Sequence, residues 1–185
     1  MAWNIKTTSD ENAIHTIFTL LTQCELDDWN KDNIKFMIGG LADSRIYKYA
    51  SKKAYKKIKK EYPEYFLENG FKIPNRTDFT VEHTIPNEFV YKYLFKLTEE
   101  GKISKQIITK ILGKLVCTII CTDENKKLNE TYKSTMPEDW SFNDNQFERY
   151  TQTEIDIVDY NGIKSELLKD EIDNKGVVIY SANKQ

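Results

Sequence analysis

The stretch Val81-Glu82-His83-Thr84-Ile85-Pro86 decides the fold prediction, together with a later stretch, Ile119-Ile120-Cys121-Thr122-Asp123-Glu124-Asn125. The first is typical of the end of a short strand, and we expect that strand to run from residue 79 to 83. The second indicates a β-branched strand over residues 115–121. It leads through a Thr-Asp turn into a helix that Thr122 caps and that ends near residue 131. Strand, strand and helix in this order predict that Glu82, His83 and Asn125 meet.

These three side chains have complementary chemistry. A carboxylate and an amide oxygen are ligands that a hard divalent cation accepts, with water completing the shell. An imidazole titrates near neutral pH and can act as a general base. Asp123 is a competing oxygen ligand that we rank behind Asn125. The alternative interpretation is an ordinary strand end followed by an ordinary helix cap.

Length and composition indicate one soluble domain, with or without appendages. The chain has 185 residues, of which 39% are hydrophobic and 30% charged, enough for a sizeable core. The longest apolar run is too short to cross a bilayer, and the first residues lack the layout of a secretory signal. Three cysteines without paired spacing predict reduced thiols and a cytoplasmic protein.

Charge is unevenly distributed along the chain. Residues 1–44 carry 3 basic and 7 acidic side chains, a net charge of −4, and residues 138–185 carry 5 and 11, a net charge of −6. Residues 45–137 carry 19 basic and 11 acidic side chains, a net charge of +8. The positive charge therefore coincides with the candidate site, which favours a polyanionic partner.

Much of this positive charge comes from a predicted basic helix over residues 44–60. Ile46, Ala50, Ala54 and Ile58 form its apolar stripe with a step of four residues. A merely solvated face is the alternative, but no acid is interspersed, which favours contact with phosphates. A membrane-surface helix fits less well, because the apolar side, widened by Tyr47 and Tyr55, is alanine and tyrosine rather than Leu, Phe or Trp. The cationic residues are Arg45, Lys48, Lys52, Lys53, Lys56, Lys57, Lys59 and Lys60.

The rest of the chain predicts mixed elements. Helical spacing is visible over residues 9–22, 86–97 and 104–113, and over 33–37, where a glycine pair interrupts it. Residues 61–78 contain prolines and a glycine and are typical of a connector. Two more strands are expected at 155–160 and 176–180.

The run Glu82-His83-Thr84-Ile85-Pro86-Asn87-Glu88-Phe89 resembles the acid-His-x-x-Pro strand end of HNH (ββα-metal) endonucleases, in particular the HNH domain of RNA-guided CRISPR nucleases and related phage junction resolvases. Thr122-Asp123-Glu124-Asn125-Lys126 is similar to the start of their metal-binding helix. The resemblance covers residues 79–131. Two features depart from the family pattern. The segment between the two motifs is longer here, and Gly113-Lys114 stands where the family has a middle asparagine.

The resemblance implies roles for individual residues. Glu82 and Asn125 would hold Mg²⁺ or Mn²⁺, with Asp123 as the competing ligand, and His83 would be the general base. Phosphates of DNA, double-stranded in our expectation, would lie near Lys126, Lys127 or Arg149. Nucleases of this kind that cut both strands often use two active sites, which leaves a homodimer as one option.

The fold class that follows is α+β. A helical segment with the basic helix (1–78) precedes an expanded ββα-metal core (79–137) and a small acidic α/β tail that packs on the core (138–185). The resemblance implies a metal-dependent HNH-type endonuclease that hydrolyses DNA phosphodiester bonds, in defence or in a mobile element. The alternative is a non-catalytic nucleic-acid- or partner-binding protein on a degenerate HNH core.

Overall fold

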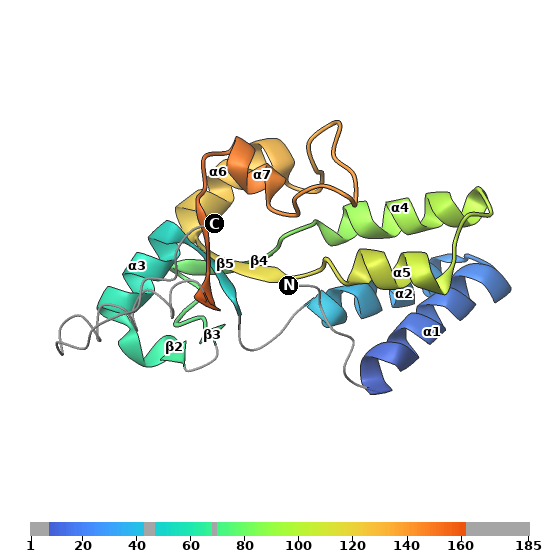
Figure 1. Ribbon diagram of the computed structural model, residues 1–185, viewed down its shortest axis with the longest axis horizontal. Coiled ribbons are helices and arrows are strands. Elements are labelled where there is room, and N and C mark those ends of the chain that lie inside the picture. Colours follow the sequence, from blue (N-terminus) through green and yellow to red (C-terminus); the bar gives the residue numbers. More distant parts are fainter. Residues whose placement is uncertain (1–7, 43–46, 68–69, 162–185) are drawn as a thin grey trace, which may run out of the picture.

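The computed structural model describes residues 8–42, 47–67 and 70–161, and a four-stranded mixed sheet lies at its centre (Figure 1). The strand order is β4-β5-β1-β6, in which β5 and β1 are parallel and the other neighbours are antiparallel. A separate antiparallel pair, β2 and β3, lies beside the sheet. The strands are β1 (Tyr49–Ser51), β2 (Phe66–Leu67), β3 (Gly70–Phe71), β4 (Phe79–His83), β5 (Cys117–Cys121) and β6 (Ile157–Asp159).

Helices surround this sheet in three groups. In Figure 1, α1, α2, α4 and α5 gather at one end of the sheet, α3 lies at the other, and α6 and α7 lie together above the paired strands β4 and β5. The α+β class expected from the sequence is therefore confirmed. The helices are α1 (Thr8–Gln23), α2 (Asp28–Ala42), α3 (Lys52–Glu61), α4 (Asn87–Glu99), α5 (Lys105–Leu112), α6 (Thr122–Tyr132) and α7 (Glu148–Gln152), with a short 3₁₀ turn, η1 (Pro63–Tyr65).

The basic helix is shorter than predicted. Residues 49–51 form strand β1, and α3 begins only at Lys52. The cause is Ser51, whose Oγ accepts a hydrogen bond from the backbone N–H of Ala54 at 3.0 Å and so caps the helix. Residues 43–46, including Arg45, lie outside the described part of the chain.

Other predicted boundaries also shift. Helix α2 continues through Gly39 and Gly40, where we predicted an interruption. Residues 66–71 of the predicted connector contain the β2–β3 pair. Cys121, not Thr122, is the N-cap of α6, because the Thr122 hydroxyl donates instead to the carbonyl of Thr77 at 2.8 Å. The expected strand at 176–180 lies outside the described residues.

The β4–β5–α6 unit has the predicted order of elements. Phe79 pairs with Cys121, and His83 pairs with Cys117. Because α6 begins directly after Cys121, its first turn lies beside the start of β4. Among the described residues, no helix is long and apolar enough to span a membrane.

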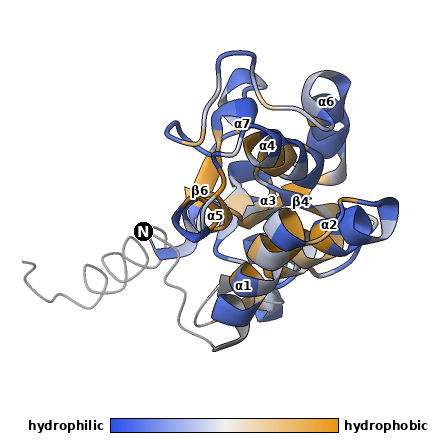
Figure 2. Ribbon diagram, turned by 90° about the vertical axis from the view of Figure 1, so that its right-hand side faces the viewer, coloured by the Kyte–Doolittle hydropathy of each residue, from blue (hydrophilic) through white to orange (hydrophobic). Residues whose placement is uncertain are grey.

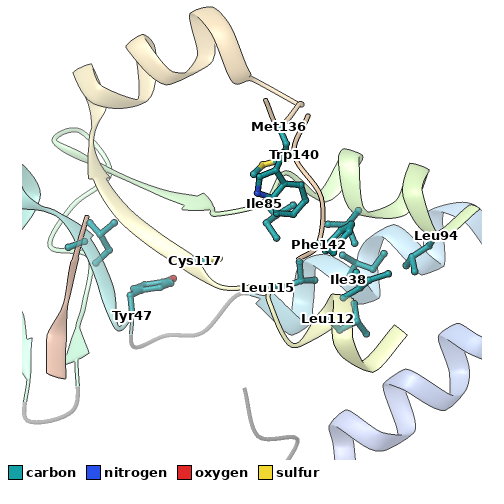
Figure 3. Packing of buried hydrophobic residues seen from close by; sticks show 14 of the residues in the cluster. Ile38, Tyr47, Ile85, Leu94, Leu112, Leu115, Cys117, Met136, Trp140 and Phe142 are labelled. Atoms are coloured by element: carbon teal, nitrogen blue, oxygen red, sulfur yellow. The ribbon is translucent and has the colours of Figure 1, made fainter. Parts of the chain in front are cut away.

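The two faces of the paired strands β4 and β5 pack into different hydrophobic cores. Phe79, Ile119 and Cys121 belong to the larger core, whose packing at the ends of α2, α4 and α5 is shown in Figure 3. Ile120, on the other face, packs with Leu128 of α6 in a smaller cluster. Since successive side chains of a strand point to opposite faces, this division places even-numbered residues of both strands toward α6 and α7.

The three sequence segments share one sheet. The segment before residue 79 supplies β1, the middle segment supplies β4 and β5, and the acidic tail supplies β6. The larger core likewise extends from Ile14 to Tyr160.

Candidate functional site

Glu82 forms an ion pair with Arg149. Residue 82 lies on the sheet face that α6 and α7 cover, and its Oε1 accepts a hydrogen bond from Arg149 Nη2 at 2.7 Å. The Arg149 side chain is 0% exposed and that of Glu82 19% exposed. A charged side chain is almost never fully buried without a partner of opposite charge, so the pair is the reason that Arg149 can lie there.

The guanidinium of Arg149 also ties the end of β4 to α6. Its Nε donates to the carbonyl of Thr84 at 3.0 Å, and Nη1 donates to the carbonyl of Tyr132 at 2.8 Å. Nη2 donates in addition to the carbonyl of His83. Four of the five N–H donors of the group are therefore used inside the protein. We predicted Arg149 as a phosphate contact; its complete burial is incompatible with that role in this conformation.

His83 lies on the opposite face of the sheet from Glu82. Its partner in the ladder, Cys117, belongs to the larger core. The half-buried imidazole has Nε2 at 3.3 Å from the side-chain nitrogen of Asn87, in the first turn of α4. The Oδ1 atom of Asn87 is buried and has no hydrogen-bond partner among the described residues. Asn87 is a neighbour of the histidine that our sequence analysis did not single out.

The two predicted ligands on α6 are engaged elsewhere. Asn125 Oδ1 accepts a hydrogen bond from the side-chain amide of Asn129 at 3.2 Å. Asp123 forms an ion pair with Lys53 of α3, and hydrogen bonding to that ammonium group lowers the pKa of the Asp123 carboxyl. Both contacts involve the N-terminal half of α6, the half that lies next to α3.

The direction of α6 separates these groups further. The helix starts beside Phe79, and the carbonyl of its last residue, Tyr132, shares the guanidinium of Arg149 with Glu82. The last turn of α6 is therefore the turn linked to Glu82. Asn125 lies seven residues before Tyr132, which at about 1.5 Å per residue places it about 10 Å from Tyr132 along the helix axis.

Within residues 8–42, 47–67 and 70–161, no hydrogen bond or ion pair joins Glu82, His83 and Asn125 to one another. No three His, Cys, Asp or Glu side chains in this part of the chain gather in an arrangement that could hold a metal ion. Each predicted oxygen ligand thus already has a protein partner. A divalent ion at Glu82 would have to displace Arg149.

The lysines of α3 divide into two sets. Lys52, Lys53 and Lys57 pair with Asp156, Asp123 and Asp78 respectively. Three others are exposed and have no acidic partner among the described residues: Lys56, Lys59 and Lys60.

Further predicted phosphate contacts lie near this helix. On α6, Lys126 is exposed without an acidic partner in the described part of the chain, whereas Lys127 pairs with Glu154 at 3.0 Å. Lys48 is exposed immediately before β1.

A cavity of about 290 Å³ lies away from these residues. It is bounded by β6, α7 and the loops next to them, and carboxylates and aromatic rings line it. None of the predicted catalytic or metal-binding residues contributes to its wall. The lining residues are Tyr49, Asn145, Phe147, Thr151, Glu154, Ile155, Asp156, Ile157 and Asp159.

Comparison with known proteins found no family model, no curated protein and no solved structure that matches this chain.

Proposed function

We propose that the chain is a nucleic-acid-binding protein built on an HNH-like ββα unit, in which the Glu82–Arg149 ion pair takes the place of a metal centre. The observation that carries this proposal is the burial of Arg149 against Glu82. The carboxylate that the HNH resemblance assigns to a cation has a cation already, supplied by the protein itself.

The energetics of this pair oppose metal binding at Glu82. Removing one partner of a buried ion pair typically costs about 3–5 kcal/mol, because the remaining charge stays buried without compensation. A divalent ion would have to offset that cost and also replace the bonds that Arg149 makes to three carbonyl groups. The pair therefore favours a structural role for Glu82.

The position of α3 supports nucleic acid as the ligand. The ion pair between Lys53 and Asp123 and the hydrogen bond between Ser51 and Glu124 hold α3 against the start of α6. Three lysines without an acidic partner among the described residues, Lys56, Lys59 and Lys60, thus lie on the helix next to the ββα unit, with Lys126 on α6 itself. Lysine ammonium groups contact phosphates without reading sequence, and each such contact adds to the salt dependence of binding.

A DNA-binding assay tests this proposal. We expect the wild type to retard duplex DNA in a gel, with an affinity that falls steeply with salt. A Lys56→Gln, Lys59→Gln, Lys60→Gln variant should bind more weakly and with a salt slope smaller by about 1 for each lost phosphate contact. The matched control, Lys92→Gln, removes a lysine that pairs with Glu88 on α4 and should leave binding unchanged. If the triple variant binds DNA as tightly as the wild type, α3 does not contact the DNA and this part of the proposal is refuted.

A second candidate is the metal-dependent endonuclease that the resemblance implies. It is favoured by the observed order of β4, β5 and α6 along the chain and by the half-buried imidazole of His83 at the end of β4. A supercoiled plasmid incubated with the protein and Mg²⁺ or Mn²⁺ separates the two candidates. We expect no nicking; nicking that His83→Ala abolishes while DNA binding persists would establish the nuclease and refute the ion-pair replacement.

A further inference from the structure

Helix α2 exposes two large aromatic side chains on its outer face. Trp29 is 72% exposed and Phe36 is 81% exposed. Seven residues separate them, so they lie on one side of the helix, two turns or about 10 Å apart. Helices α1, α2, α4 and α5 form the end of the molecule that Figure 2 presents.

This aromatic face is not needed to hold α2 in the fold. The opposite side of the helix already carries a buried stripe, in which Ile34 and Ile38 are completely buried in the larger core. Single exposed apolar residues are common, but two large rings aligned on one helix face are typical of a protein–protein contact.

The surroundings of the two rings are mainly acidic. Four carboxylates lie at the start of α2 or just before it, whereas the helix contains two lysines. One of these lysines, Lys35, is already occupied: it pairs with Asp32 at 3.2 Å and lies over the ring of Tyr91 at 4.6 Å. The carboxylates belong to Glu25, Asp27, Asp28 and Asp32.

We propose that the Trp29–Phe36 face of α2 is a docking surface for a cationic amphipathic helix of a partner protein. An apolar stripe on such a helix would cover the two rings, and its lysines or arginines would face the carboxylates around them. A second copy of this chain fits less well, because its own α2 face carries the same excess of carboxylates. An anionic membrane surface is disfavoured by the same carboxylates.

The test uses two synthetic helical peptides with the same leucine stripe, one flanked by lysines and the other by glutamates. We expect the full chain to bind the lysine peptide in fluorescence anisotropy, with an affinity that weakens as salt is raised. Replacing both rings, Trp29→Gln with Phe36→Gln, should weaken binding at least tenfold, since buried aromatic anchors dominate such contacts. Because both rings are exposed, the variant should keep the wild-type melting temperature.

Two control variants make the result specific. Tyr93→Ser removes the third large exposed ring, on α4, and should leave binding unchanged. Asp28→Lys with Asp32→Lys should shift the preference toward the glutamate peptide. Three results would overturn the proposal. They are equal binding of the two peptides, binding that survives loss of both rings, and a wild-type dimer in sedimentation that the ring variant converts to monomer.

Discussion

The buried side chain of Arg149 holds the candidate site together. It has one ionic partner, Glu82, and three carbonyl partners, one of them at the end of α6. The sequence predicted Glu82 as a ligand of a divalent cation, and in the structure its carboxylate pairs with a guanidinium group of the protein instead. The sequence could not predict the pairing of Glu82 with Arg149, because the two residues are 67 positions apart and nothing in the local pattern around Arg149 links them.

The exchange of Arg149 for methionine should be strongly destabilising. Methionine fills a similar volume but leaves the Glu82 carboxylate and three carbonyl groups without their donor. We expect the free energy of unfolding to fall by about 3–5 kcal/mol, measured by urea denaturation.

A double-mutant cycle tests whether the ion pair causes this loss. Glu82→Gln removes the charge while keeping the shape, so Arg149→Met should cost less in that background, by about 1 kcal/mol or more. Additive effects of the two substitutions would show that the carbonyl contacts of Arg149, and not Glu82, account for its burial.

Among the elements, α3 was the least accurately predicted. The spacing of Ala50, Ala54 and Ile58 continues without a break across the boundary between β1 and α3. Ala50 is buried because β1 lies between two other strands, whereas Ala54 and Ile58 are buried by the helix face. A strand of three residues leaves no periodic signal of its own. The longer elements β4, α4 and β5 have clear patterns, and the sequence placed them within a few residues.

Ser51 sets the boundary between β1 and α3, and its replacement tests how much the cap contributes to stability. It accepts the N–H of Ala54 and donates to Glu124 Oε2 at 2.5 Å. Ser51→Ala should lower the free energy of unfolding by about 1–2 kcal/mol, since both the cap and the link to α6 are lost. Thermal and urea melts measure the loss.

A second cap provides the comparison. Ser104 caps α5 by accepting the N–H of Ile107 at 3.2 Å. Ser104→Ala should therefore cost less than Ser51→Ala, about 1 kcal/mol or below. If the two losses are equal, the bond from Ser51 to Glu124 contributes nothing measurable.

At the scale of the whole molecule, the basic residues of α3 form ion pairs with acidic residues of other elements. Lysines of α3 pair with Asp78, just before β4, and with Asp123 at the start of α6. Hydrogen bonding to Lys57 is the main cause that lowers the pKa of Asp78, and Lys53 does the same for Asp123. Much of the apparent basic surface is thus neutralised on folding, which the net charges of the segments did not reveal.

These two carboxyl groups predict a pH dependence of stability. Their pKa values are lower in the folded chain than in the unfolded chain, where the pKa of an aspartate is about 3.9. The stabilisation they provide is therefore complete above that value and is lost as the pH falls through the folded-state pKa. We expect the melting temperature, followed by circular dichroism, to drop as the pH falls below about 4.

Substitution locates the origin of this drop. Asp78→Asn together with Asp123→Asn should lower the melting temperature at neutral pH and flatten its dependence on acid. Asp139→Asn, an exposed residue, should leave the curve unchanged. An acid transition of unchanged steepness in the double variant would assign it to other groups.

The place of β1 has a consequence for how the chain folds as it is synthesised. Tyr49 pairs with Thr118 on one side and with Asp159 on the other, so its neighbours follow about 70 and 110 positions later. When the chain has emerged from the ribosome only as far as residue 100, this strand has neither of its neighbours. Closure of the sheet must therefore wait until nearly all of the described chain has emerged, and contacts this distant in sequence make slow folding the rule.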